Sequence, residues 1–328
     1  MVIAVDAAGG DYFPKNPVQG AIDAIGEKQD LTILLVGPED LIKAELRNYS
    51  YDTERIQILH APDVIGMDES PSTAVKNKRN SSIVLGLSAH KQQKCEAFVS
   101  AGNTGALLAA SMFILGKLEG VQRPTIAATI PTIKGIRLLI DAGANLELKP
   151  ETYRQFAQMG TIYSREIMGI KDPTVGLINV GEEPEKGTEL LKEVFGILKG
   201  IPNFRGNIEG RDIFNATADI FLCDGLIGNI LLKFGESIPS TLQMIIGKTM
   251  KEMNLDADTR DTVVNILHKS LHAFNYEHVG GIPFLGVDGI SMVGHGGSTP
   301  AAVKNMILNA SNCVEAGINK KIIASLKN

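Results

Sequence analysis

One recurring pattern constrains the fold of this chain more than any other feature. A short run of β-branched or aliphatic residues ends in glycine and a polar residue, and a helical pattern follows at once. Strands that alternate with helices predict a largely parallel sheet covered by helices on both faces, and apolar runs without alternation fit strands buried on both sides. The sequence therefore predicts an α/β fold. The pattern occurs at residues 2–11, 31–40, 97–105, 137–145, 175–183, 220–229 and 290–299.

Residues 226–276 depart from this rhythm and read as a long helical excursion with two apolar-periodic segments. One interpretation is a helical hairpin packed on the body or on a second subunit, and the other is a membrane-surface or partner-docking element. No repeat or linker interrupts the chain, so we expect a single domain over 1–328 with a hairpin appendage at about 235–276. Helices are predicted at residues 15–27, 71–90, 103–118, 150–168, 185–198 and 298–316.

Composition excludes several functional classes. A formal net charge of −5, aromatics at only 5% and the absence of Trp argue against a nucleic-acid-binding protein. No apolar stretch reaches the roughly 18 residues of a spanning helix, and the N-terminus lacks the basic and apolar regions of a signal peptide. Cys95, Cys223 and Cys313 are widely spaced, which predicts reduced thiols at or near the core of a cytoplasmic protein.

The segment FVSAGNTGALLAA, residues 98–110, places a small polar loop between a strand and a helix. Gly102 and Gly105 permit close approaches, and Asn103 or Thr104 can cap the helix. Unpaired N–H groups and the helix dipole then make a binding site for a small anion such as phosphate. A tight turn without a ligand explains the same residues. Because ligands sit at the carboxyl ends of parallel strands, we expect the site to combine several of the seven junctions.

Three carboxylates follow apolar strands: Asp6, Asp141 and Asp224. Such groups cap helices, orient loops or hold metal. No clustered His and Cys set accompanies them, so zinc is not expected, and no metal is predicted.

Two side chains at other junctions suggest chemistry. Lys186 begins a helix where Glu182 is the expected dipole partner, which hints at a substrate anion, although a solvated lysine fits equally. His295 lies in a glycine-rich turn and either donates to an oxyanion, acts as acid or base, or is structural.

No protein nucleophile or nucleotide motif stands out. There is no G-x-S-x-G elbow, and Asp224 beside Cys223 would raise the pKa of the thiol. Residues 294–299 and 247–249 only partly match nucleotide-binding fingerprints, so no cofactor is predicted. A reaction that joins two bound substrates directly needs positioning and charge stabilisation instead.

Taken together and in order, eight segments of the chain resemble the bacterial phosphate acyltransferase family, PlsX. The resemblance implies a three-layer αβα Rossmann-like sandwich of the isopropylmalate dehydrogenase and phosphotransacetylase type. It also implies a cytoplasmic homodimer that is peripherally associated with the membrane. The segments are DAAGGDYFPK, DESPSTAVKNKRNSSI, FVSAGNTGALLAA, LIDAGANLELKP, LINVGEEPEKGTEL, NFRGNIEGRDIF, CDGLIGNILLK and YEHVGGIPFLGVDGI with the later GHGGS.

The activity implied by this resemblance is transfer of a fatty acyl group from acyl-[acyl-carrier-protein] to inorganic phosphate, giving acyl phosphate for phospholipid synthesis. Ala8, Tyr12 and Leu148 stand where the family commonly has Met, His and Cys, so any role for those family residues does not carry over. The matching residues expected to line the site are Asp6, Gly9, Gly10, Asp11, Asp141 and Asn145. Glu182 and Asp224 are expected to line it as well.

Our hypothesis from sequence is direct attack by bound phosphate on the thioester. Residues 102–105 and Lys186 hold phosphate, and Asn229 or His295 stabilises the oxyanion. The basic residues Lys76, Lys78 and Arg79 form either a solvated helix face or a docking patch for the acidic carrier protein. The expected partners are this carrier, a second copy of the chain, the membrane and a downstream acyl-phosphate-using acyltransferase.

Three alternatives remain open at this point. The first is a phosphotransacetylase-like transfer from acyl-coenzyme A, which uses the same chemistry with a different thiol carrier. The second is a dehydrogenase of the isopropylmalate type. The third is a non-enzymatic scaffold at the membrane surface, built on the helical excursion.

Overall fold

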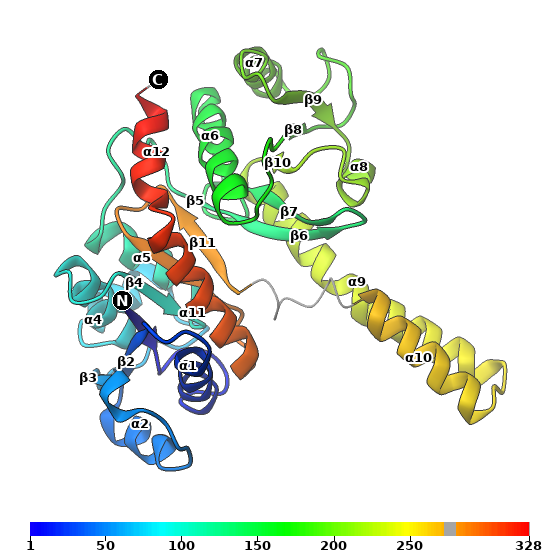
Figure 1. Cartoon of the computed structure of the whole chain (residues 1–328). Helices are drawn as coiled ribbons and strands as arrows, with labels where there is room; N and C mark the ends of the chain where they lie inside the picture. Colours follow the sequence, from blue (N-terminus) through cyan, green and yellow to red (C-terminus); the bar gives the residue numbers. More distant parts are fainter. Residues whose placement is uncertain (272–279, 328) are drawn as a thin grey trace.

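The computed structural model describes residues 1–271 and 280–327 of the chain. Their strands form two mostly parallel sheets (Figure 1) rather than the one sheet that the repeated pattern suggested. One has seven strands in the order β3-β2-β1-β4-β12-β11-β5, and the other has five in the order β6-β7-β10-β8-β9. The strands are β1 Val2–Asp6, β2 Thr32–Gly37, β3 Ile56–His60, β4 Ala97–Ser100, β5 Thr125–Ile126, β6 Ala128–Thr132, β7 Gly135–Ile140, β8 Val175–Ile178, β9 Phe204–Ile208, β10 Ile220–Leu222, β11 Ile282–Leu285 and β12 Ile290–Val293.

Helices cover both faces of the seven-stranded sheet. Alternate side chains of β1 point to opposite faces, so Ile3 and Val5 belong to one buried cluster and Ala4 to another. Helices α1 and α11 pack on each other and on the first face, and α4 and α5 pack on the second. The helices of this part are α1 Lys15–Glu27, α2 Glu39–Leu46, the 3-10 turn Thr53–Arg55, α3 Pro71–Asn77, α4 Ser82–Lys91, α5 Thr104–Ile114, α11 Pro300–Glu315 and α12 Ile318–Leu326.

The five-stranded sheet is sandwiched in the same way. Tyr153 and Phe156 of α6 pack on one face, while Ile213 of α8 packs on the other with partly buried residues of α9. Strand β6 pairs with β7 in antiparallel fashion and forms one edge of this sheet. The three layers confirm the predicted α/β class. The helices of this part are α6 Pro150–Glu166, α7 Glu189–Leu198, α8 Gly210–Asn215, α9 Gly225–Glu252 and α10 Ala257–Leu271.

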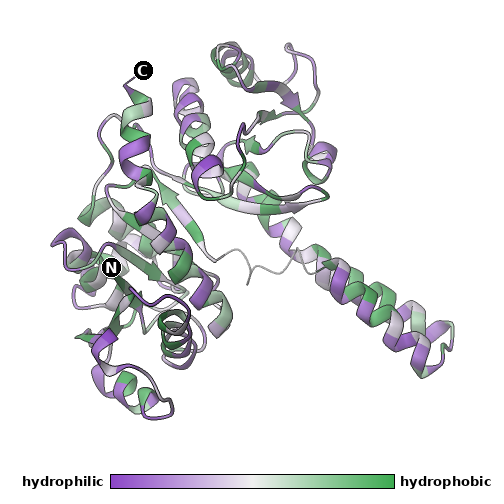
Figure 2. Cartoon of the chain, viewed as in Figure 1, coloured by the Kyte–Doolittle hydropathy of each residue, from purple (hydrophilic) through white to green (hydrophobic). Residues whose placement is uncertain are grey.

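Helix α9 leaves the five-stranded sheet and runs out with α10 as a projecting pair (Figure 1). Hydrophobic and hydrophilic residues alternate along both helices (Figure 2), and α10 has no buried residue. Helix α9 begins ten residues before the expected start of the appendage, and residues 272–276 of that appendage lie outside the described residues. Among the helices that the structure describes, none is both long and apolar enough to cross a membrane.

Three of the predicted helices need adjustment, and the one expected over 103–118 is α5, which ends at Ile114. The helix expected over 71–90 is divided into α3 and α4, because the chain turns at residues 78–81 and the Ser81 side chain caps the second helix by accepting a hydrogen bond from the Val84 N–H. The helix expected from residue 185 begins at Glu189 behind a Thr188 cap. All three cysteines are buried and unpaired, as expected.

Candidate active site

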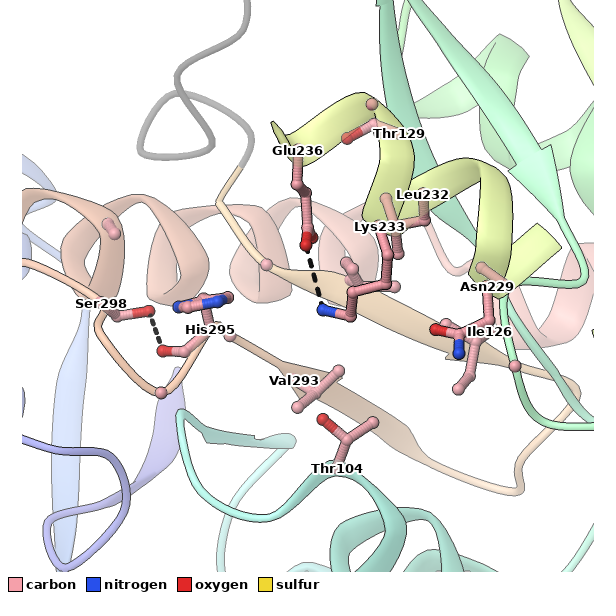
Figure 3. A pocket seen from close by; sticks show the side chains of 18 of the residues that line it. Thr104, Ile126, Thr129, Asn229, Leu232, Lys233, Glu236, Val293, His295 and Ser298 are labelled. Atoms are coloured by element: carbon pink, nitrogen blue, oxygen red, sulfur yellow. Dashed lines mark hydrogen bonds and ion pairs between the residues drawn. The ribbon is translucent and has the colours of Figure 1, made fainter. Parts of the chain in front are cut away.

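A cavity of about 550 Å³ lies between the two sheets (Figure 3). The seven-stranded part contributes the start of α5, strands β11 and β12, and the turn before α11. The other part contributes the β6–β7 hairpin and the first turns of α9. Most of the lining is apolar, and the apolar side chains include Leu108, Ile126, Ile130, Ile136, Leu232, Ile282 and Val293.

The loop before α5 reaches this cavity, with Thr104 and Gly105 on its wall. Asn103 caps the helix by accepting the Ala106 N–H at 3.0 Å, as predicted. Its amide nitrogen donates to three carbonyl oxygens of residues 66–69, and the Gly102 N–H donates to Ser100 Oγ at 3.0 Å. The donors of Gly102 and Asn103 that carry these bonds are therefore committed to the protein, and the part of the loop that faces the cavity begins at Thr104.

Gly105 is required by packing. A Cβ atom at this position would lie 2.6 Å from Pro71 Cγ, at the start of α3. Contacts this short force a neighbour to move. Gly105 thus allows α3 and α5 to approach each other. The sequence indicated that this glycine allows the close approach of a ligand and did not predict this packing role.

His295 lines the cavity from the turn that follows β12. Its Nδ1 accepts the Gly297 N–H at 3.1 Å, so in the neutral ring the proton is on Nε2. Ser298 Oγ donates to the His295 carbonyl at 2.6 Å (Figure 3), which ties the turn to the start of α11. Asp11 also lines the cavity, and its N–H donates to the carbonyl of Gly296 at 2.8 Å.

Helix α9 contributes three further polar side chains to the cavity. Asn229, Lys233 and Glu236 all line it, and Lys233 Nζ lies 3.0 Å from Glu236 Oε2 (Figure 3). Sequence reasoning selected Asn229 but missed Lys233 and Glu236, because charges in a helix usually mark a solvated face. The available signal was spacing: Lys233 follows Asn229 by four residues, which places both on one side of the helix.

Comparison with known proteins identifies the family. A family model described as "Fatty acid synthesis protein" matches residues 1–321. Phosphate acyltransferase of Chlorobaculum parvum is 45% identical over 337 residues, covering 99% of both chains, and that of Salinibacter ruber is 46% identical over 312 residues, covering 94% of this chain and 92% of the relative. The chain belongs to the bacterial phosphate acyltransferase family, PlsX.

Solved structures show that this phosphate acyltransferase family chain shares its fold with more distant proteins. EutD phosphotransacetylase from Staphylococcus aureus superimposes with a TM-score of 0.61 at 13% identity, covering 95% of this chain and 94% of that one. A phosphotransacetylase from Streptococcus pyogenes gives a TM-score of 0.58 at 12% identity, covering 100% and 94%. These likenesses agree with the fold type that the sequence resemblance implied.

Several residues predicted for the site of this phosphate acyltransferase family member have structural roles next to it. Asp6 is buried and accepts hydrogen bonds from Ser100 Oγ at 2.6 Å and the Ala8 N–H at 3.0 Å. Burial raises the pKa of the Asp6 carboxyl, although these hydrogen bonds oppose the rise. Gly9 and Gly10 pack against residues 100–102 and the 294–297 turn.

Asp141 holds together the loop that follows β7. Its carboxylate accepts hydrogen bonds from the N–H groups of Ile126, Ala144 and Asn145 and from the Asn145 side chain, at 2.6–3.2 Å. Burial raises the pKa of this carboxyl as well. Asp224 caps α9 by accepting the Ile227 N–H at 2.9 Å. These carboxylates orient loops and cap helices, and the described residues contain no group of three or more His, Cys, Asp and Glu suited to a metal ion.

The remaining predicted residues do not line the cavity. Lys186 lies in the loop after β8, where its carbonyl accepts a hydrogen bond from the Asn179 amide, and Glu182 lies 3.6 Å from Arg211. Of the basic residues 76–79, Lys78 is engaged within the fold. Its Nζ lies 2.6 Å from Glu69 Oε1 and donates to the Val64 carbonyl at 2.7 Å.

Proposed function

We propose that this protein transfers a fatty acyl group from acyl-[acyl-carrier-protein] to inorganic phosphate and releases acyl phosphate. The observation that carries the proposal is the cavity itself: it joins a long apolar lining to a cation, an imidazole and the start of a helix. An apolar lining suits a fatty chain, and the polar groups suit an oxyanion. Family membership supports the same chemistry.

The reaction proceeds by direct displacement. A phosphate oxygen attacks the thioester carbonyl carbon, a tetrahedral oxyanion forms, and collapse of this intermediate breaks the C–S bond. The thiolate of the carrier leaves with the electron pair of that bond and takes up the proton that hydrogen phosphate gives up. The protein supplies no nucleophile, and burial raises the pKa of Cys223 well above that of an ordinary thiol, with Asp224 adding to the rise.

Different polar groups of the cavity bind the phosphate and stabilise the oxyanion. Lys233 exchanges its contact with Glu236 for the incoming phosphate, which also meets the start of α5 at Thr104 and Gly105. His295 and Asn229 donate to the oxyanion. Because Lys186 does not line the cavity, we assign the phosphate-binding role expected of Lys186 to Lys233.

The proposal includes the expected partners. Lys76 and Arg79 belong to the exposed patch offered to the acidic carrier protein, while Lys78 is held by Glu69. We further propose a homodimer, peripheral contact with the membrane, and delivery of acyl phosphate to a downstream acyltransferase. These follow from the family resemblance.

The test is an assay with radiolabelled phosphate and either acyl-[acyl-carrier-protein] or acyl-coenzyme A at equal concentration. Hydroxylamine converts acyl phosphate to a hydroxamate and so reports the product. The proposal predicts product from the carrier-bound donor. Product from coenzyme A alone would instead identify a phosphotransacetylase-like enzyme.

Three lysine variants test the assignment of the phosphate site. We expect Lys233→Ala to reduce kcat/KM by about 10²-fold, because it removes a charge that stabilises the transition state. Lys248→Ala, farther along the same helix beside Glu252, is the matched control and should retain activity. If Lys186→Ala loses activity and Lys233→Ala does not, phosphate binds elsewhere.

A further inference from the structure

A second cavity of about 470 Å³ adjoins the first. It lies at the end of α6, between the β6–β7 hairpin and α11. Thr129 and Ile136 line both cavities. The two spaces therefore meet at these two side chains.

The two side chains that separate the cavities, Thr129 and Ile136, lie on the hairpin at one edge of the five-stranded sheet. In the β6–β7 ladder Thr129 is opposite Leu138, and Pro131 is opposite Ile136. Directly opposed residues of an antiparallel pair point to the same face, and alternate residues of a strand share that face. Thr129 and Ile136 thus project from the same face of the hairpin, and β6 is the edge of this sheet among the strands that the structure describes.

The polar groups that line the second cavity are largely paired within the protein. The Asn309 amide donates to Tyr163 Oη at 3.2 Å and to the Gly280 carbonyl at 3.3 Å, and Arg137 Nε lies 2.8 Å from Asp219 Oδ1. About half of the lining that remains for an occupant is hydrocarbon. The apolar side chains are Ile167, Met168, Ile170 and Leu308. An alkyl chain can lie along this apolar part because it requires no hydrogen bonds.

The β6–β7 hairpin lies across the first cavity from the start of α5. Thr104 and Thr129 occupy opposite sides of the first cavity (Figure 3). With phosphate at Thr104, a chain that extends across the cavity ends at the hairpin.

We propose that Thr129 and Ile136 set the length of the acyl chain that this enzyme accepts. The chain runs from the polar groups across the first cavity, and its end meets these two side chains. An acyl chain that ends before Ile136 fits entirely within the first cavity. A longer acyl chain must pass Ile136 and enter the second cavity. This inference rests on the proposed function, because it concerns the substrate of the same site.

The first test is a series of acyl-[acyl-carrier-protein] donors of increasing chain length. Ile136→Ala widens the passage, so we expect kcat/KM for the longest donors to rise about tenfold relative to short ones. Ile136→Phe narrows it and should lower kcat/KM for the longest donors by a similar factor of about ten relative to short donors. Ile133→Ala is the control: this side chain is 77% exposed at the tip of the same hairpin and lines neither cavity.

A second test does not depend on turnover. The chain contains no Trp, so Ile136→Trp introduces a single tryptophan between the two cavities, and this tryptophan can be excited without exciting tyrosine. A long-chain fatty acid brominated at its last carbon should quench this fluorescence, whereas the same acid brominated next to its carboxylate should quench it far less. Ile133→Trp, outside both cavities, should be insensitive to either probe.

The outcomes separate the two proposals. If the unmodified protein forms no acyl phosphate from any donor, the proposed function is wrong, and bromine quenching still reports where an alkyl chain lies. If the protein is active but the Ile136→Ala and Ile136→Phe variants keep the same chain-length profile, the inference is overturned. Equal quenching by both brominated acids would also overturn it. A misfolded Trp variant, detected by circular dichroism, leaves the decision to the donor series.

Discussion

At the scale of single residues, the buried carboxylate of Asp141 stabilises more of the surrounding structure than its position at a strand end suggests. It accepts three hydrogen bonds from the loop that follows β7 and one from the Ile126 N–H of β5. Asp141→Ala leaves these donors without an acceptor, so we expect a loss of about 3 kcal/mol in the free energy of unfolding. Urea denaturation measures it. Exposed Asp23→Asn is the control, and equal stabilities of the two variants would contradict this role.

His90 is a residue whose protonation weakens the fold. Its Nδ1 lies 3.0 Å from the Cys95 carbonyl, and its Nε2 accepts the Ile290 N–H at 3.0 Å at the start of β12. Burial lowers the pKa of His90 below the ordinary 6.5, although the Cys95 hydrogen bond and the nearby Asp288 and Glu96 oppose this shift. The folded protein therefore holds the neutral ring and the unfolded chain takes up the proton first.

The protonation of His90 in the unfolded chain makes the free energy of unfolding depend on pH. Above about pH 6.5 the ring is neutral in both states and the contribution of His90 to stability is complete. As the pH falls through about 6.5, the unfolded state gains protons and the free energy of unfolding decreases. We expect a smaller decrease in His90→Gln than in the unmodified protein between about pH 8 and pH 5. The exposed His268→Gln variant should behave like the unmodified protein, and an identical decrease in His90→Gln would exclude this contribution.

At the scale of elements, two glycines of α9 differ in what surrounds them. A Cβ atom on Gly228 would lie 1.8 Å from the Asp141 carbonyl oxygen, whereas a Cβ atom on Gly247 would meet nothing within 4 Å. Gly228→Ala forces the helix away from the loop after β7, at a cost of about 3 kcal/mol. Gly247→Ala should instead stabilise the helix by up to about 1 kcal/mol.

Thermal unfolding and turnover of these two variants check the prediction together. Because Asn229 and Lys233 lie within five residues of Gly228 on α9, a displaced helix should also lower kcat/KM in Gly228→Ala. The Gly247→Ala variant should keep normal turnover. If both variants gain stability, the close packing of α9 on the loop is not tight.

Elements with strong local signals are the ones that the sequence predicts. Seven apolar strands and a helix at 15–27 are found as expected, because buried strands and capped helices leave continuous or periodic patterns. Strands β3, β5, β6, β9 and β11 were missed. In β6, Pro131 and two threonines make the segment look like a loop, and proline is tolerated there because β6 is an edge strand. The division into two sheets could not be predicted either, since strand order depends on long-range pairing.

The same limit applies to the candidate site. Thr104, Gly105, Asn229 and His295 were selected from local motifs and Asp11 from the family resemblance, and all five line one cavity. Lys233 and the hairpin residues were missed, because only the packing of α9 against the two sheets turns them toward that cavity. The buried aspartates were selected because they follow strands, and the same position explains why they hold loops.

At the scale of the whole molecule, the cavity is the place where both sheets contribute to one surface. A ligand that fills it contacts the α5 and α11 side and the α9 and β6–β7 side together. It therefore stabilises their joint arrangement and binds only the folded chain. A long-chain β-ketophosphonate, an unreactive mimic of acyl phosphate, should raise the free energy of unfolding by about 2.7 kcal/mol at 100 times its dissociation constant. The expected rise in Tm is about 4 °C in calorimetry.

The shape of the calorimetric transition shows whether the ligand bridges the two sheets. If it contacts both, the mimic should move the entire transition upward, and any separate low-temperature transition of the ligand-free protein should merge with the main one. Lys233→Ala should reduce the shift at equal mimic concentration, because it removes the cation that meets the phosphonate, while Lys248→Ala should not. A mimic that stabilises only one of two resolved transitions would show that the ligand binds one sheet alone, and the shared cavity would then not be the substrate site.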